Sequence, residues 1–237
     1  MNEMSLEELA SYLHLTPAQV MKLASRDKIP GRKVGGEWRF NESEIHHWLE
    51  QQIGVADEQA LERVENVLQQ RQRKDTGTSD IIKVADLIPV DCVKLPLTSR
   101  SKTALVRELC DHLMNAGWLW DPEEMCDAIL QREELHPTAL DNGVALLHPR
   151  RPLPGILPDR LIGLGMTRHG VPFGGPRGAL TDVFFLLAST DDATHLRTLA
   201  RLSRLLALPD FVPRLRASET SAEAVQVVAD YDAMIDG

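Results

Sequence analysis

The sequence predicts two domains of different fold class: a small all-α domain, then a layered α/β domain in which a mixed β-sheet is flanked by helices. Residues 1–53 carry closely spaced helix-start signals and one short hairpin. From residue 81 onward, apolar runs of strand length alternate with long amphipathic helices. A polar stretch over residues 54–80 separates the two patterns and is expected to be a helical connector and linker. The predicted domains are therefore residues 1–53 and 81–237.

Composition limits the class of protein. Of the residues, 43% are hydrophobic and 26% are charged, as in soluble globular proteins. No apolar run approaches the roughly 18 to 20 residues that a membrane span requires, and the start "MNEMSLEELA" is acidic, unlike a targeting segment. We therefore expect a cytoplasmic protein without membrane insertion, cofactor or metal. The cysteines are odd in number and not closely paired, and are expected to be reduced thiols: Cys92, Cys110 and Cys126.

Two short helices are predicted at the N-terminus. Ser5 and Glu8 form a capping box, and apolar residues at helical spacing follow over residues 6–13. The second helix is expected over residues 17–26, with Thr16 as its N-cap and a proline at the first helical position. A tight turn joins them.

A hairpin and a third helix complete the first domain. "RKVGGEWRF" has Gly35-Gly36 at its tip, and either Asn41 or Ser43 caps a helix through "ESEIHHWLEQQI". The order is helix, turn, helix, wing, helix. The stretch from residue 5 to residue 49 resembles the excisionase or MerR-like winged helix-turn-helix domain, and this resemblance implies DNA binding.

The charge of this domain differs from that of the whole chain. The net charge is −9, but residues 22–39 hold six basic and two acidic residues, a local balance of +4. By the resemblance, the second helix faces a major groove and the wing lies near phosphates. Small domains of this kind also serve as protein docking modules, and that alternative stays open. The expected DNA-binding residues are Thr16, Gln19, Lys22, Arg26, Arg32, Lys33 and Arg39.

The connector carries one helical stripe, Leu61, Val64 and Leu68, before it ends in the polar run "RKDTGTSD". Two interpretations stay open. The stripe pairs two chains into a homodimer that reads two DNA half-sites, or it packs on one of the chain's own domains.

In the second domain "DCVKLPL" predicts a strand. A helix over "SKTALVRELCDHLMNAG" ends at Gly117, and another over "DPEEMCDAILQREEL" has Asp121 as its N-cap. Three apolar runs, "GVALLH", "RLIGLGMT" and "TDVFFLLAS", have the length of buried strands. Three helices are expected over "DATHLRTLARLSRLLA", "DFVPRLRA" and "TSAEAVQVVADYDAMI".

His148 lies in "LDNGVALLHPRR", at the carboxyl end of a predicted strand that follows an Asn-Gly turn. Ligands of α/β sheets bind at such edges. Imidazole is neutral and nucleophilic near pH 7, so it is able to accept a phosphoryl group and pass it on. The position therefore favours a reactive histidine.

The segment "QREELHPTALDNGVALLHPR" resembles the active-site signature of the mannitol-type (fructose and nitrogen-regulatory) enzyme IIA domain of the bacterial phosphoenolpyruvate-dependent phosphotransferase system. Arg132-Glu133, Thr138, Gly143, Ala145 and His148 hold the matching positions. The resemblance spans about residues 81–235. It also covers a later strand, loop and helix start, where His195-Leu196 stand.

This resemblance implies that His148 is phosphorylated by the histidine phosphocarrier protein, with His195 as the second active-site histidine and Arg132 as the active-site arginine. Arg132 offers two N–H groups to phosphate oxygens. His195 follows N-cap candidates at residues 189–191, so it lies at the positive end of a helix. Thr138 and Gly143 are expected to support the phosphate site.

The signature is not complete in this chain. Ala139 and Asp141 replace two glycines, and Leu147 replaces the proline before the histidine, while Pro149 follows it. We expect Asp141 to lie close to the phosphate site, where its carboxylate either repels the phosphoryl group or orients His148.

Three functions remain open at this point. The leading hypothesis is a regulator whose DNA binding responds to phosphorylation of the enzyme IIA-like domain. The first alternative is a phosphotransfer component for sugar uptake, an enzyme of the phosphohistidine phosphotransferase type. The second is a degenerate enzyme IIA domain that accepts no phosphate and acts by protein contact.

Overall fold

The computed structural model describes residues 3–13, 15–41, 44–45, 48 and 82–235. The chain forms two compact units that divide between Ile81 and Ile82. The predicted connector with its apolar stripe, and most of the third predicted helix, lie outside the described residues. Among the described residues, no helix is long and apolar enough to cross a membrane.

The two predicted N-terminal helices are confirmed as α1 (Leu6–Tyr12) and α2 (Pro17–Ala24). Both begin with a capping box. The Ser5 hydroxyl accepts from the Glu8 amide at 3.2 Å, while the Glu8 carboxylate accepts from the Ser5 amide at 2.7 Å. Thr16 and Gln19 repeat this exchange in α2. Each box satisfies backbone donors that a helix start leaves without an intrahelical partner.

The wing is an antiparallel hairpin of β2 (Arg32–Val34) and β3 (Glu37–Asn41). Its tip residues Gly35 and Gly36 have φ of 61° and 89°, the positive values that a tight hairpin turn requires. A further strand, β1 (Glu3–Met4), pairs with the other edge of β3. The sequence did not predict β1, because two residues show no periodicity.

The first unit has a small apolar core and a capped start to its third helix. Leu9, Val20, Phe40 and Ile45 are fully buried. The Asn41 side chain accepts from the Glu44 amide at 3.3 Å, so Asn41 acts as the N-cap that the sequence left open.

The second unit is built on a four-stranded sheet in the order β4-β6-β7-β5. β4 pairs parallel with β6, β5 pairs parallel with β7, and β6 pairs antiparallel with β7, so the sheet is mixed as predicted. The strands are β4 (Val93–Leu97), β5 (Val144–Leu147), β6 (Leu161–Pro172) and β7 (Leu180–Ala188). β6 is longer than its apolar run, because pairing resumes at Val171 beyond a polar, irregular stretch.

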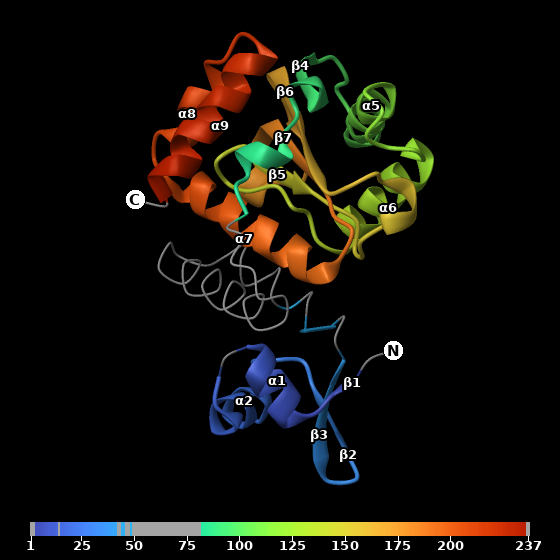
Figure 1. Ribbon diagram of the computed structural model, residues 1–237, viewed down its shortest axis with the longest axis vertical. Coiled ribbons are helices and arrows are strands. Elements are labelled where there is room, and N and C mark those ends of the chain that lie inside the picture. Colours follow the sequence, from blue (N-terminus) through green and yellow to red (C-terminus); the bar gives the residue numbers. More distant parts are fainter. Residues whose placement is uncertain (1–2, 14, 42–43, 46–47, 49–81, 236–237) are drawn as a thin grey trace. The chain divides into compact units, whose positions relative to one another are not determined.

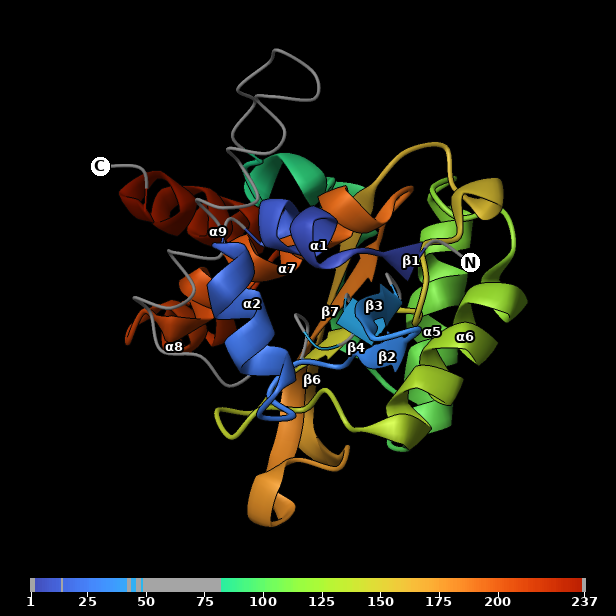
Figure 2. The same cartoon turned by 90° about the horizontal axis from the view of Figure 1, so that it is seen from below.

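Helices cover both faces of this sheet, with α5 and α6 on one side and α7, α8 and α9 on the other (Figures 1 and 2). All five helices were predicted. Their bounds are α5 (Lys102–Asn115), α6 (Pro122–Leu135), α7 (Asp192–Ala207), α8 (Phe211–Arg216) and α9 (Ser221–Ile235). Short 3₁₀ helices lie at Ala85–Leu87, Val90–Cys92, Pro154–Ile156 and Pro176–Gly178.

Apolar side chains from both sides pack on the central strands. Phe184 of β7 is fully buried and meets Phe173 edge-on, with 5.2 Å between ring centroids. Leu105 and Leu109 of α5 belong to the same cluster. All three cysteines are buried free thiols, as expected.

A buried ion pair ties α7 to α9. Arg201 Nε lies 2.7 Å from Asp232 Oδ1, and both residues are 2% exposed. Arg201 Nη2 also donates to the Asp232 carbonyl at 2.9 Å, and Asp232 Oδ2 accepts from the Ala85 amide at 3.2 Å. The pair thus holds two helices and the first 3₁₀ helix in one network.

Replacing Asp232 with alanine should lower the free energy of unfolding by about 3–5 kcal/mol, because the Arg201 charge is then buried without its counterion. Urea denaturation of the full chain measures this effect. Asp230→Ala, an exposed neighbour in α9, is the control and should cost less than about 0.5 kcal/mol. Equal effects of the two changes would contradict the role of the ion pair.

Glu108 of α5 holds the loop that follows β4. Its carboxylate accepts from the amides of Thr98 and Ser99 at 3.1 and 2.8 Å and lies 3.2 Å from Lys94 Nζ. Burial by itself raises the pKa of Glu108, but the hydrogen bonds from Ser99, Thr98 and Lys94 outweigh it. They hold the pKa at about 2, below the ordinary 4.5.

Because the pKa of Glu108 is lower in the folded protein than in the unfolded chain, its ionised carboxylate stabilises the fold. This stabilisation is complete above the unfolded pKa of 4.5 and is lost as the pH falls toward 2. Glu108→Gln should therefore cost about 1–2 kcal/mol at pH 7, and the difference from wild type should vanish near pH 2. Chemical denaturation across this pH range tests it. Glu134→Gln, which changes an exposed carboxylate of α6, should show no such trend.

Candidate functional site

The carboxyl ends of β5 and β7 lie at the same edge of the sheet. The two strands are parallel, and Leu147 is the register partner of Leu186. His148 follows β5 directly, and the loop after β7 leads into α7, whose N-cap Asp191 accepts from the Thr194 amide at 2.8 Å. This edge therefore joins a strand end to a helix start, the arrangement in which open α/β sheets bind ligands.

His148 and His195 meet at this edge. Their ring centroids are 5.1 Å apart and the planes are inclined by 49°. Both side chains are buried, with 2% and 5% of their surface exposed. The structure thus brings together two histidines that the sequence singled out from distant segments.

The hydrogen bond of His148 determines its tautomer. Its Nδ1 lies 2.8 Å from the carbonyl oxygen of Leu146. A carbonyl oxygen only accepts, so Nδ1 carries the proton, and in the neutral ring Nε2 holds the lone pair. Nε2 is consequently the nucleophilic atom of His148.

Arg132 lies in the last turn of α6 and is 5% exposed. Its Nη1 donates to the carbonyl of His136 at 2.7 Å, which holds the guanidinium against the segment that follows the helix. A fixed guanidinium loses less entropy when it binds an oxyanion.

Thr138 is engaged by Glu133, the residue after Arg132. The Glu133 carboxylate is buried, accepts from the Thr138 amide at 3.1 Å and from its hydroxyl, and pairs with Lys102 Nζ at 3.2 Å. Glu133 stands in the signature, but the sequence predicted no role for it, and it gave no indication of Lys102. An acidic residue directly beside Arg132 in the signature was the available signal for Glu133.

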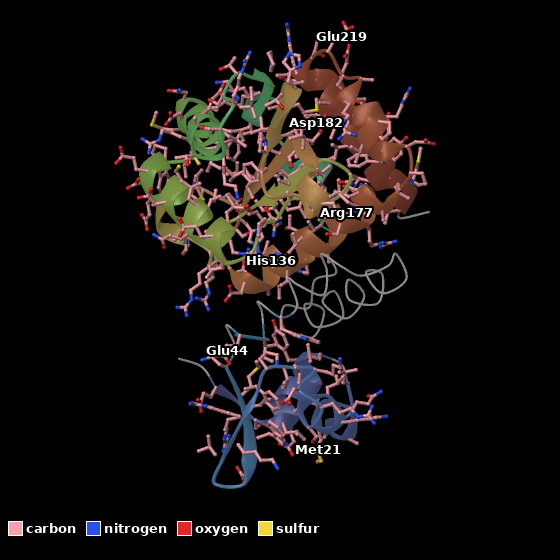
Figure 3. The ribbon with its side chains drawn as sticks, turned by 180° about the vertical axis from the view of Figure 1, so that it is seen from behind. Met21, Glu44, His136, Arg177, Asp182 and Glu219 are labelled. Carbon is pink, nitrogen blue, oxygen red and sulfur yellow. The ribbon has the colours of Figure 1, made fainter. Side chains whose placement is uncertain are left out.

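Asp141 and Gly143 lie beyond the other end of β5, contrary to expectation. At about 3.3 Å per residue, the strand separates Gly143 from His148 by about 16 Å. The Gly143 carbonyl accepts from the Asp182 amide at 2.9 Å. In Figure 3, Asp182 lies well apart from His136, the residue whose carbonyl accepts from Arg132. Asp141 is exposed on the turn before Gly143. Its carboxylate is therefore not placed at His148.

Gly143 has a packing role at this far end. Its φ is +83°, and a Cβ atom there would lie 2.5 Å from Arg216 Nη2. Arg216 donates to both carboxylate oxygens of Asp182, at 2.8 and 2.6 Å, and to the carbonyl of Asn142 at 2.7 Å. Glycine allows this ion pair to approach the backbone.

Two other departures from the signature fall in the packed core. Ala139 forms an isolated antiparallel bridge to Ala145, and Leu147 is fully buried in β5. Both side chains belong to the apolar cluster under α5 and α6. They fill space there and add no charge to the histidine pair.

The residues predicted to bind DNA lie on α2, at its two ends and on the wing. Val20 and Ala24 bury one face of α2, while Lys22 and Arg26 are exposed. Thr16 and Gln19 are exposed. The side-chain oxygen of Gln19, Oε1, accepts from the Thr16 amide in the capping box.

On the wing, Lys33 Nζ lies 5.3 Å from the centre of the Trp38 ring. Two wing arginines form surface ion pairs, Arg32 with Glu3 and Arg39 with Glu37, the latter at 3.0 Å. Surface pairs of this kind contribute only about 0–1 kcal/mol, so another anion is able to replace the carboxylate.

Among the described residues, no group of three or more His, Cys, Asp or Glu side chains is placed to hold a metal ion. The arrangement instead offers a nucleophilic nitrogen next to a second imidazole at the start of a helix. Such a site is suited to transfer of an anionic group.

Comparison with known proteins gives two family matches. Residues 86–231 match the model of the phosphoenolpyruvate-dependent sugar phosphotransferase system EIIA 2 domain, and residues 3–53 match a helix-turn-helix domain. Each match falls within one of the two compact units.

Curated relatives include a nitrogen regulatory protein of Bradyrhizobium diazoefficiens, 31% identical over 151 residues, which are 62% of this chain and 94% of that protein. The fructose-specific EIIABC component of Bacillus subtilis is 28% identical over 153 residues, or 64% of this chain. The chain matches only 24% of the length of that component.

Solved structures with the same fold include the nitrogen regulatory protein IIA-Ntr of Neisseria meningitidis, with a TM-score of 0.55 at 23% identity, covering 61% of this chain and 98% of that one. The mannitol IIA domain of Escherichia coli has a TM-score of 0.52 at 20% identity, covering 60% and 98%. Because the family model matches more than half of its residues, this chain belongs to the EIIA 2 family of the phosphotransferase system, with a helix-turn-helix domain at its N-terminus.

Proposed function

We propose that this protein is a phosphotransferase-linked regulator in the cytoplasm, in which a DNA-binding domain over residues 1–53 is coupled through residues 54–80 to an enzyme IIA domain over residues 81–237. His148 accepts a phosphoryl group from the histidine phosphocarrier protein. The observation that carries the proposal is the buried contact between His148 and His195 at the start of α7.

The transfer step follows from the tautomer of His148. Nε2 attacks the phosphorus of the carrier's phosphohistidine, and a new N–P bond forms as the carrier's N–P bond breaks. The electron pair of the broken bond stays on the carrier's imidazole nitrogen. The proton on Nδ1 of His148 stays in place, hydrogen-bonded to the Leu146 carbonyl, so the step needs no external base.

In the proposed mechanism, three groups stabilise the added charge. The start of α7 contributes the positive end of a 16-residue helix. His195 donates a hydrogen bond to the phosphoryl oxygens, and the Arg132 guanidinium supplies a full positive charge. Thr138 supports this end of the site through its bond to Glu133.

DNA binding by the first unit rests on exposed charge. Lys22 projects from α2, Arg26 is exposed in the turn that follows this helix, and the wing carries Arg32, Lys33 and Arg39. Phosphate groups of DNA replace Glu3 and Glu37 as partners of the wing arginines. In the regulator, about two negative charges added at His148 alter contacts between domains or between two chains.

Incubation with phosphoenolpyruvate, enzyme I and the phosphocarrier protein should give wild type an acid-labile phosphate that His148→Ala lacks. His195→Ala should slow the labelling by about 100-fold or more, as loss of a donor to a developing anion does. His136→Ala removes an exposed histidine and should label like wild type. Asp141→Asn should also keep the wild-type rate, because Asp141 lies at the far end of β5. A wild-type chain without label under these conditions would contradict phosphotransfer.

Lys33→Ala should weaken DNA binding for all sequences and reduce the slope of log K against log salt by about 1, as loss of one phosphate contact does. The measurement is a salt titration of binding to sheared genomic DNA. Lys83→Ala removes the same charge from an exposed site in the second unit and serves as the control. Absence of DNA binding by wild type at low salt would favour a docking role for the first unit.

A second candidate function is a phosphotransfer component for sugar uptake. The match to a fructose-specific component favours it, as does the fold shared with a solved complex of mannitol enzyme IIA and phosphorylated enzyme IIB, which has a TM-score of 0.51. This function requires onward transfer from His148 to an enzyme IIB and no retention of DNA. A degenerate, non-accepting domain is the third alternative. Against it, Asp141 lies at the far end of β5, and the side chains of Ala139 and Leu147 fill the apolar core.

A further inference from the structure

Ser189 is the first residue after β7 and lies in the loop that leads into α7. It is 3% exposed, and its Oγ lies 3.4 Å from Nδ1 of His195. The contact crosses from the strand end to the helix and orients the imidazole from the side of the sheet.

Capping of α7 does not account for Ser189. The N-cap is Asp191, whose carboxylate accepts from the Thr194 amide at 2.8 Å. A buried hydroxyl needs a hydrogen-bond partner, and His195 provides one. The side chain therefore serves the histidine and not the helix start.

The two rings require different tautomers. His148 has its proton on Nδ1 and a lone pair on Nε2. If His195 had the same tautomer, its Nε2 lone pair would meet the phosphoryl oxygens and repel them. A serine hydroxyl that donates to Nδ1 of His195 leaves the ring proton on Nε2, where it is a donor.

We propose that Ser189 is a positioning residue that donates to Nδ1 of His195 and keeps the ring proton on Nε2, so that Nε2–H donates to the phosphoryl group on His148. The role rests on the proposed function, since it acts on the phosphorylated site. The 3.4 Å separation is long for a hydrogen bond, and contacts of this kind in active sites shorten when the reacting group is bound.

The experiment uses the full chain, labelled with ¹⁵N at histidine, in three variants beside wild type. Ser189→Ala removes the hydroxyl, Ser189→Thr retains it, and Ser203→Ala removes another buried serine hydroxyl, on α7, as the matched control. Two readouts are taken: the ring-nitrogen shifts of His195 in the unphosphorylated protein, and the rate of phosphoryl acceptance from the phosphocarrier. A thermal scan verifies that each variant is folded.

Wild type, Ser189→Thr and Ser203→Ala should show a protonated Nε2 at His195. Ser189→Ala should move part of the proton to Nδ1 and lower the acceptance rate about three- to tenfold, which is the effect of one neutral hydrogen bond. If wild type accepts phosphate and Ser189→Ala matches it in tautomer and rate, the role of Ser189 is overturned and the proposed function stands. If wild type accepts no phosphate, the proposed function fails, and the positioning role with it.

Discussion

Parallel hydrogen bonding between β5 and β7 is the constraint on which the second unit depends. Because the strands run in the same direction and in register, both of their carboxyl ends reach one edge of the sheet. His148 follows one strand and α7 follows the other, so the imidazole pair is a direct result of this register. A shift by one residue would turn His148 to the opposite face of the sheet and separate it from His195.

Ion pairs hold the elements on either side of this register. Arg201 and Asp232 join α7, the helix that carries His195, to α9. Arg216 and Asp182 join α8 to the start of β7 and reach the turn before β5. The strand pair is thus anchored at its amino end by one arginine, and α7 is anchored by another. Within this frame, hydrogen bonds to Leu146 and Ser189 orient the two rings.

Much of this arrangement could be predicted from the sequence, because local signals were strong. The capping residues Ser5, Thr16 and Asp121 each start the helix expected of them. His148 was placed at a strand end by an apolar run and an Asn-Gly turn. β1 escaped prediction, since its pairing with β3 comes from tertiary contact and not from pattern.

The prediction failed where it equated nearness in sequence with nearness in space. Asp141 is seven positions from His148, but the extended strand β5 lies between them and holds them far apart. Ser189 was considered only as a cap candidate, since nothing in the sequence shows that its side chain turns toward His195. The connector over residues 54–80 stays a prediction.

The burial of His148 has a consequence for timing. With 2% of the residue exposed, bulk water has little direct access to the ring, and a phosphoryl group on Nε2 would be shielded in the same way. Under the proposed function, loading and loss of phosphate both require the surrounding side chains to move aside. Access to Nε2, and not only the chemistry of the N–P bond, then governs both the loading of the site and the loss of its phosphoryl group.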